Sequence, residues 1–167
     1  YNQWYFEHLG YKLSATLLRF LPIVLIAFLL PSNIGLSLPV SFNAFLLFLI
    51  TLIIGALMTS AISMIVVYLT FKTQSAKGTQ TIVNTLCGVL GGFFIPIPLM
   101  PVAIQNVLNY LHFRFIVDLP FRIYIGNIGL KSALTFSLLS LAWLIVLIIV
   151  GKLLMKQALK KTVIQGG

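Results

Sequence analysis

The feature that most constrains this chain is a run of 52 residues, from Phe20 to Phe71, without a single Asp, Glu, Lys, Arg or His. Two further stretches are nearly as neutral: Gly78–Phe113 carries only His112, and Ser132–Gly151 carries none of these residues. A charge at the centre of a bilayer costs roughly 2.5–3.5 kcal/mol, and roughly 20 apolar helical residues cross its ~30 Å hydrocarbon layer. The sequence therefore predicts an all-α, polytopic transmembrane helical bundle in the cell membrane.

The neutral stretches predict four spans within a single transmembrane domain covering residues 1–167. The expected spans are about 14–30, 40–71, 79–95 and 133–150, and a cytoplasmic tail covers 152–167. At ~1.5 Å per residue, a helix over 40–71 would reach ~48 Å, so it must tilt or project beyond the hydrocarbon. The linker Pro31–Pro39 contains two prolines and a glycine, which indicates a short turn.

The basic residues predict the orientation of these spans. The formal net charge of +9 would suggest nucleic-acid binding in a soluble protein, but no basic stripe interleaves with exposed aromatic residues, so no nucleic-acid partner is expected. Basic residues collect on the cytoplasmic side of a membrane, where they also meet anionic lipid. Eight of them fall on one side (Lys12, Arg19, Lys72, Lys77, Lys152, Lys156, Lys160, Lys161) and three on the other (Arg114, Arg122, Lys131). Both termini are therefore expected in the cytoplasm.

The segment 91–130, before the last expected span, is apolar but broken by prolines. Pro96, Pro98 and Pro101 cannot lie inside a continuous helix, whereas Val102–His112 has apolar residues at helical intervals. We expect a re-entrant or interfacial helical hairpin here. Irregular backbone at membrane depth is tolerated where protein or a water-filled cavity covers it, so the three prolines are candidates for an outer gate.

The third expected span is the least apolar. Its polar and small residues are Thr79, Gln80, Thr81, Asn84, Thr85, Cys87, Gly88 and Gly92, and Gly88 and Gly92 have small-xxx-small spacing. Close helix packing with interhelical hydrogen bonds explains them without a ligand. The alternative is that the span lines a translocation path. The same two interpretations apply to Gly55, Thr59 and Ser63, which recur at intervals of four in the second span.

Single charged residues near the spans have local explanations. Arg19 is expected to extend its guanidinium to the headgroups, or to pair with Glu7 or a partner's carboxylate. Asp118 lies four residues from both Arg114 and Arg122, which predicts local ion pairs, and it could cap a helix that begins near Pro120.

Motifs of catalysis are missing from the sequence. It contains no GxxxxGK[ST], HExxH or GxSxG, and it has one cysteine, Cys87, which we interpret as a packing residue. Only two carboxylates are present, Glu7 and Asp118, whereas proton-coupled carriers normally use a buried acidic residue. We therefore expect no catalytic residue, no metal site and no cofactor in this chain, and the energy for any transport must come from elsewhere.

Several motifs occur in an order that is typical of one transporter family. The span with Gly88 and Gly92 is followed by GGFFIPIPLMP, a short helix, DLPF at Asp118, a last span and a tail ending in ALKKTVIQGG. In this order and spacing the chain resembles the membrane (permease) subunit of bacterial type-2 ABC exporters. Members of that family have six spans, and the resemblance covers their last four. It implies that the chain is the C-terminal part of a longer permease, with a re-entrant element before its last span.

The resemblance also implies partners and site residues. Residues Tyr5, Phe6, Glu7 and His8 would contact the ATPase, and ATP and Mg would bind to a pair of ATPase subunits on other chains. Two identical or related permeases would form the substrate path and export by alternating access. The path candidates are Thr81, Asn84, Gly88, Gly92, Phe93 and Phe94. An aromatic and small-residue lining favours an amphipathic or apolar cargo over a sugar.

A different class of function is compatible with the same residues. The chain could be a membrane scaffold or sensor that moves nothing and oligomerises through its small-residue helix faces. An intramembrane enzyme is disfavoured by the shortage of acids, bases and nucleophiles.

Overall fold

The computed structural model describes residues 1–30, 37–73 and 75–165, with side chains for all of these except residues 19, 20, 23 and 159–165. Within these ranges the chain forms only helices, as the sequence predicts. In chain order they are α1 (Asn2–Leu29), α2 (Phe42–Thr73), α3 (Ala76–Leu90), the short 3-10 helix η1 (Ile97–Leu99), α4 (Val102–Leu108), α5 (His112–Ile116), α6 (Asp118–Tyr124) and α7 (Leu130–Gln165).

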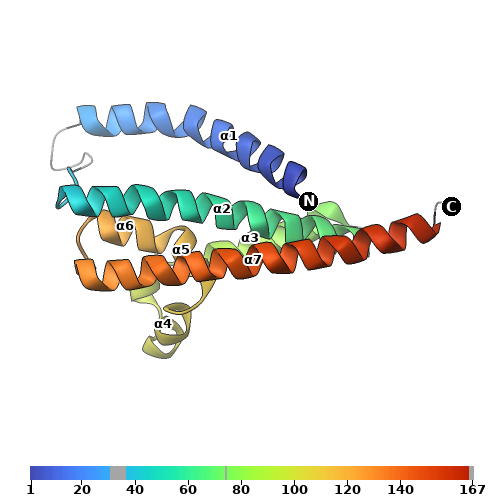
Figure 1. Ribbon diagram of the computed structural model, residues 1–167. Coiled ribbons are helices and arrows are strands. Elements are labelled where there is room, and N and C mark those ends of the chain that lie inside the picture. Colours follow the sequence, from blue (N-terminus) through green and yellow to red (C-terminus); the bar gives the residue numbers. More distant parts are fainter. Residues whose placement is uncertain (31–36, 74, 166–167) are drawn as a thin grey trace.

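Helices α2 and α7 form the centre of the bundle. They run side by side in the same direction, while α1 and α3 run the opposite way, and α7 continues past the other helices to the C-terminus (Figure 1). Helices α5 and α6 pack between α2 and α7, and their Phe115 and Leu119 are fully buried against α2 residues such as Met58 and Ala61. The core is therefore a contact between two long apolar helices, with two short helices inserted at one end.

Two helices in the described ranges are long and apolar enough to cross a membrane: α2 and residues Leu130–Ala158 of α7. They contain almost all of the predicted spans 40–71 and 133–150. The predicted span 14–30 falls on α1, where the side chains of residues 19, 20 and 23 lie outside the description. Pairing of Arg19 with Glu7 likewise lies outside the described residues, and so do residues 31–36 of the turn predicted at Pro31–Pro39. The four-span arrangement stays a prediction.

Helix α3 ends earlier than predicted. It has 15 residues, ~22 Å at 1.5 Å per residue, and stops at Leu90 instead of continuing to Ile95. The amides of Phe93 and Phe94 both donate to the carbonyl of Gly88, at 3.0 and 3.2 Å, which closes the helix end, and Gly92 has a φ of +84° that only glycine adopts readily. Gly91, at the cap position, and Gly92 therefore end the helix before Pro96, the first proline.

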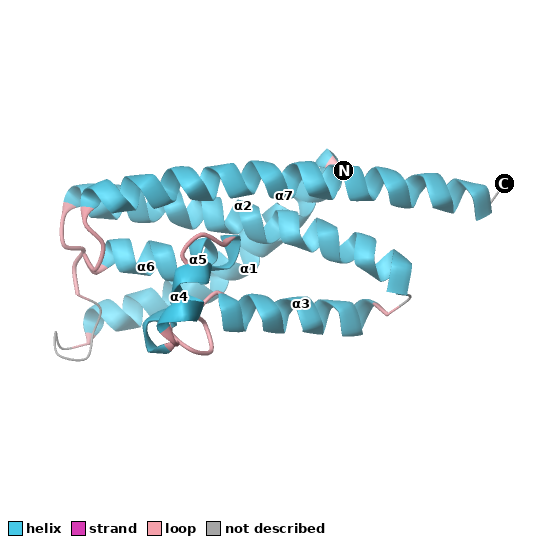
Figure 2. Ribbon diagram, turned by 90° about the horizontal axis from the view of Figure 1, so that it is seen from below, coloured by secondary structure: helices cyan, strands magenta, loops and turns pink. Residues whose placement is uncertain are grey.

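The segment after α3 forms several short helices (Figure 2). Val102–Leu108 is helical, as predicted, but the expected helix to His112 is interrupted by a turn at 109–111. In Figure 1, α4 projects away from the bundle, whereas α5 and α6 extend beyond the end of α3 along α2. The depth of this segment in a bilayer, and hence the re-entrant hairpin, stays a prediction.

The predicted cap at Asp118 is wrong. Asp118 is the first residue of α6, Val117 occupies the cap position, and no side chain caps this helix. The reason is that the Asp118 carboxylate is bound by two arginines. Its Oδ2 accepts from Arg114 Nε at 2.8 Å, and the carboxylate also accepts from Arg122 Nε at 2.9 Å. These ion pairs confirm the pairing that the four-residue spacing predicts.

Candidate functional site

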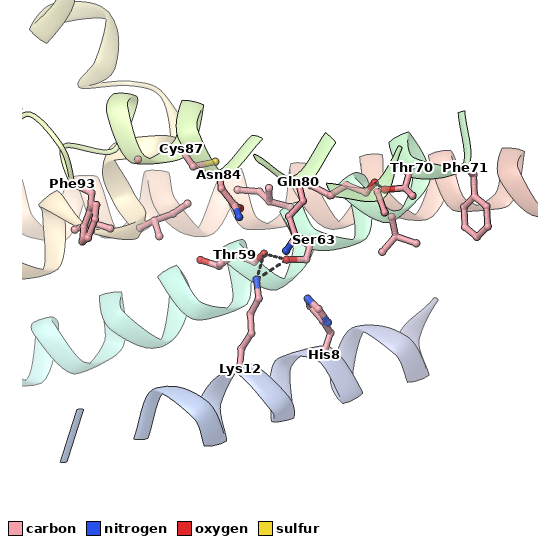
Figure 3. A pocket seen from close by; sticks show the side chains of 17 residues that line it. His8, Lys12, Thr59, Ser63, Thr70, Phe71, Gln80, Asn84, Cys87 and Phe93 are labelled. Atoms are coloured by element: carbon pink, nitrogen blue, oxygen red, sulfur yellow. Dashed lines mark hydrogen bonds between the residues drawn. The ribbon is translucent and has the colours of Figure 1, made fainter. Parts of the chain in front are cut away.

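One cavity brings polar and apolar side chains together: a groove between α1, α2 and α3 (Figure 3). It has a volume of about 500 Å³. We call it the α1–α3 groove. Its polar residues come from all three helices: His8 and Lys12 from α1, Thr59, Ser63 and Thr70 from α2, and Gln80, Asn84 and Cys87 from α3. Lys12, Ser63 and Gln80 lie near its middle, whereas Thr70 lies beside Phe71 at one end (Figure 3). Its remaining lining is apolar.

Lys12 crosses from α1 to a polar stripe on α2. Its ammonium donates to the backbone carbonyl of Thr59 at 3.3 Å and to Ser63 Oγ at 2.5 Å. The stripe exists because small hydroxyl residues recur every four positions: Ser63 Oγ donates to the Thr59 carbonyl, and Thr59 Oγ1 donates to the Gly55 carbonyl. The small-residue face of α2 that the sequence shows thus supplies the two hydrogen-bond acceptors of Lys12.

Among the residues that the structure describes, Lys12 is the only charged one that lines the groove. The sequence has two acidic residues, and neither is bound to it: Asp118 is paired with Arg114 and Arg122, and Glu7 is exposed on α1. No ion pair involving Lys12 occurs in the part of the chain that the structure describes. The groove therefore carries an uncompensated positive charge.

His8 lies one helical turn before Lys12, outside the predicted span 14–30, and also lines the groove. Partial burial lowers the pKa of His8 below its usual value, and the nearby Lys12 ammonium lowers this pKa further. Its imidazole is consequently neutral at neutral pH, so His8 adds hydrogen-bonding capacity without adding charge.

A second polar cluster lies on α5 and α6. Arg114 is buried, contacts the Asn109 side-chain oxygen, and places its guanidinium carbon 4.9 Å from the centre of the Phe136 ring on α7. Together with the two Asp118 ion pairs, these contacts join α5, α6 and α7. Groups of His, Cys, Asp or Glu that could hold a metal ion are absent from the described residues.

Comparison with protein-family models identifies the chain. The model described as "ABC-2 family transporter protein" matches residues 9–166. The chain belongs to the ABC-2 family of transporters. Comparison with curated proteins and with solved structures gave no match. The family assignment agrees with the two apolar helices α2 and α7, and identifies the chain as a membrane component of such a transporter.

In this ABC-2 family protein, three of the six predicted path residues line the groove: Asn84, Gly88 and Phe93. The other three do not. Thr81 is exposed on α3, where its hydroxyl donates to the Lys77 carbonyl at 2.9 Å. Gly92 forms the turn after α3, and the ring of Phe94 packs directly against Gly88.

The prolines predicted as an outer gate lie elsewhere. All three are exposed: Pro96 precedes η1, Pro98 lies within it and Pro101 follows it, and none of them lines the groove. The amide of Gln105 donates to the carbonyls of Pro98, at 3.2 Å, and Met100, at 2.8 Å, which stabilises this loop. Their role as a gate stays a prediction.

The predicted ATPase-contacting residues divide into two groups. Tyr5 is buried: its hydroxyl donates to the Leu57 carbonyl at 2.9 Å, and its ring stacks on Tyr1. Phe6 and Glu7 are exposed, whereas His8 faces the groove. Only Phe6 and Glu7 therefore offer their side chains to another protein.

Sequence reasoning missed Lys12 as a site residue. The sequence shows it only as a basic residue just before a span, a position that normally reports orientation. Gln80, Cys87, Thr59 and Ser63 were visible as polar residues of expected spans, but no pattern in the sequence places them opposite Lys12.

Proposed function

We propose that this chain is the permease subunit of an ATP-driven exporter, and that the α1–α3 groove forms part of its substrate path. The observation that carries the proposal is a groove with a charged and polar middle, enclosed by helices of an ABC-2 family membrane protein. Polar residues are costly inside a bilayer and tend to mark the path of a transported molecule. The path opens alternately to the two sides of the membrane.

A second, identical or related permease completes this path. The support is the outward face of α3, where Thr81 and Thr85 are exposed beside Ile82 and Leu86. In a bilayer, hydroxyl groups on such a face gain from meeting another helix instead of lipid tails.

A pair of ATPase subunits on other chains supplies the energy, with ATP and Mg bound there. We propose that Phe6 and Glu7 contribute to the contact with these subunits, because both are exposed at the start of α1. Tyr5 and His8 would support this contact only indirectly, since their side chains face the interior of the chain.

Co-purification with an ATPase tests the proposal. The double variant Phe6→Ala, Glu7→Ala is expected to lose most of the ATPase subunit that co-purifies with the wild-type permease, while membrane insertion is unchanged. Tyr11→Ala is the matched control, because Tyr11 is an equally exposed aromatic residue on the same helix. Unchanged recovery in the double variant would reject the contact. A wild-type protein that brings down no ATPase would favour the scaffold interpretation.

The proposed orientation makes a separate prediction. In a Cys87→Ser background, Ser75→Cys and Asn127→Cys are expected to react with a membrane-impermeant maleimide from opposite sides of the membrane, Ser75→Cys from the cytoplasm. Both positions are exposed, one between α2 and α3 and the other between α6 and α7. Reaction of both from the same side would show that the orientation is wrong.

A further inference from the structure

The charge of Lys12 is the feature of the groove that the path alone does not explain. Lys12 is half-buried in the groove, and burial of an ammonium group is costly unless a negative charge or several hydrogen bonds accompany it. Both carboxylates of the sequence lie elsewhere, one of them held by two arginines. A negative charge that accompanies Lys12 therefore comes from outside these 167 residues.

The hydrogen bonds of Lys12 leave room for such a group. An ammonium has three donors, and two of them bind the Thr59 carbonyl and Ser63 Oγ. On the opposite wall, the amide side chains of Gln80 and Asn84 point from α3 into the space beside Ser63 (Figure 3). The remaining ammonium donor and these two amides surround one part of the groove with groups that bind an anion.

The two ends of the groove have a different chemistry. Phe71 lies at one end and Phe93 at the other (Figure 3), and the apolar lining also includes Val66, Val67, Ile116 and Val117. A small inorganic anion at Lys12 would leave these apolar walls uncovered. The volume of about 500 Å³ is in the usual range for sites of organic ligands, roughly 300–1,000 Å³.

We infer that the α1–α3 groove binds an amphiphile with an anionic head group, and that Lys12 binds this head group while the apolar chain lies along an end of the groove. The inference deepens the proposed function and names the class of molecule that the path accepts. An anionic membrane lipid and an anionic transported amphiphile share this chemistry.

Cys87 provides a probe that the protein already contains. It is the only cysteine of the sequence, is partly exposed, and lines the groove. A bound amphiphile should slow its alkylation by a maleimide. In detergent-purified protein, dodecyl phosphate is expected to protect Cys87, whereas dodecyltrimethylammonium, which has the same chain and the opposite charge, is expected not to.

Substitution of Lys12 makes the test specific. In Lys12→Gln the half-protecting concentration of dodecyl phosphate should rise roughly tenfold or more, as expected for the loss of a charged hydrogen bond. Lys12→Arg should keep protection. Lys152→Gln is the matched control, because Lys152 is exposed on α7 and does not line the groove. Protection in each variant is expressed relative to its own alkylation rate without amphiphile, because the positive charge of Lys12 itself favours the reactive thiolate of Cys87. Thermal melting shows whether each variant is folded.

Two results would overturn the inference. One is equal protection by the two probes, and the other is an unchanged half-protecting concentration of dodecyl phosphate in folded Lys12→Gln. If Lys12→Gln does not fold, loss of protection in the folded Lys12→Arg variant overturns it as well. This assay needs no ATPase, so its failure is distinct from failure of the proposed function.

Vesicles distinguish the two sources of the amphiphile. Slower alkylation of Cys87 in phosphatidylglycerol vesicles than in phosphatidylcholine vesicles, lost in Lys12→Gln, would support a membrane lipid as the ligand. Equal rates in both vesicles, together with Lys12-dependent protection by added dodecyl phosphate, would support a transported amphiphile.

Discussion

Replacement of Asp118 by Asn is expected to lower the melting temperature of the purified protein by roughly 6–12 °C. The carboxylate of Asp118 binds Arg114 at 2.8 Å and Arg122 at 2.9 Å, and Arg114 is only 3% exposed. Its removal leaves a buried guanidinium without a counter-charge, which costs roughly 3 kcal/mol. For a domain of this size, each kcal/mol shifts the midpoint by about 2–4 °C. Far-ultraviolet circular dichroism during heating in detergent measures the change.

Glu7→Gln is the matched control for this prediction. It removes the same charge from the only other carboxylate in the sequence, but Glu7 is exposed and has no ion pair in the described residues. Its effect on the free energy of unfolding should stay within about 0.5 kcal/mol. Similar melting temperatures for Asp118→Asn and Glu7→Gln would mean that the Arg114–Asp118–Arg122 cluster does not stabilise the fold.

A Gly-to-Ala substitution should have opposite effects at two helical positions. At Gly55 an added Cβ would lie 2.9 Å from the carbonyl oxygen and 3.3 Å from the Cα of Ile116. Both are backbone atoms of α5, so α5 must move, and overpacking of this kind costs about 1–3 kcal/mol. At Gly10 a Cβ would meet nothing within 4 Å, and the higher helix propensity of alanine adds up to about 1 kcal/mol of stability.

The same thermal melts compare the two variants. Gly55→Ala should melt below the wild type and Gly10→Ala at or above it. Shifts of the same sign and size would show that helix propensity, and not the close approach of α5 to α2, determines the effect. The result would then count against the packing of α5 between α2 and α7.

The parts of the fold that the sequence predicts are those set by local composition. The neutral stretches predict α2 and α7 because any segment of such composition must be helical in a bilayer. The ion pairs of Asp118 are predictable because their partners lie one helical turn away. The end of α3 at Leu90 is less predictable. The prolines predict that the helix ends just before Pro96, whereas in the structure a turn at Gly91 and Gly92 ends it earlier.

The candidate site depends on contacts between residues far apart in the sequence. Lys12 binds Thr59 and Ser63, which follow it in the sequence by 47 and 51 positions. This contact exists only because α1 packs antiparallel on α2. Side-chain periodicity within one helix does not determine which partner it packs against or at what height. For the same reason the sequence suggests that Tyr5 is exposed at the start of a helix, whereas in the structure its hydroxyl donates to the carbonyl of Leu57 in the middle of α2.

The contact of Trp143 with the loop after α4 has a spectroscopic consequence. Its indole nitrogen donates to the Tyr110 carbonyl at 2.7 Å, and its ring lies 5.3 Å from that of His112. The other tryptophan of the sequence, Trp4, lies near the start of α1 and is 48% exposed. With Trp4 replaced by Phe, the fluorescence of Trp143 alone would report whether residues 102–112 stay docked on α7. Movement of residues 102–112 relative to α7 can thus be followed without any attached dye.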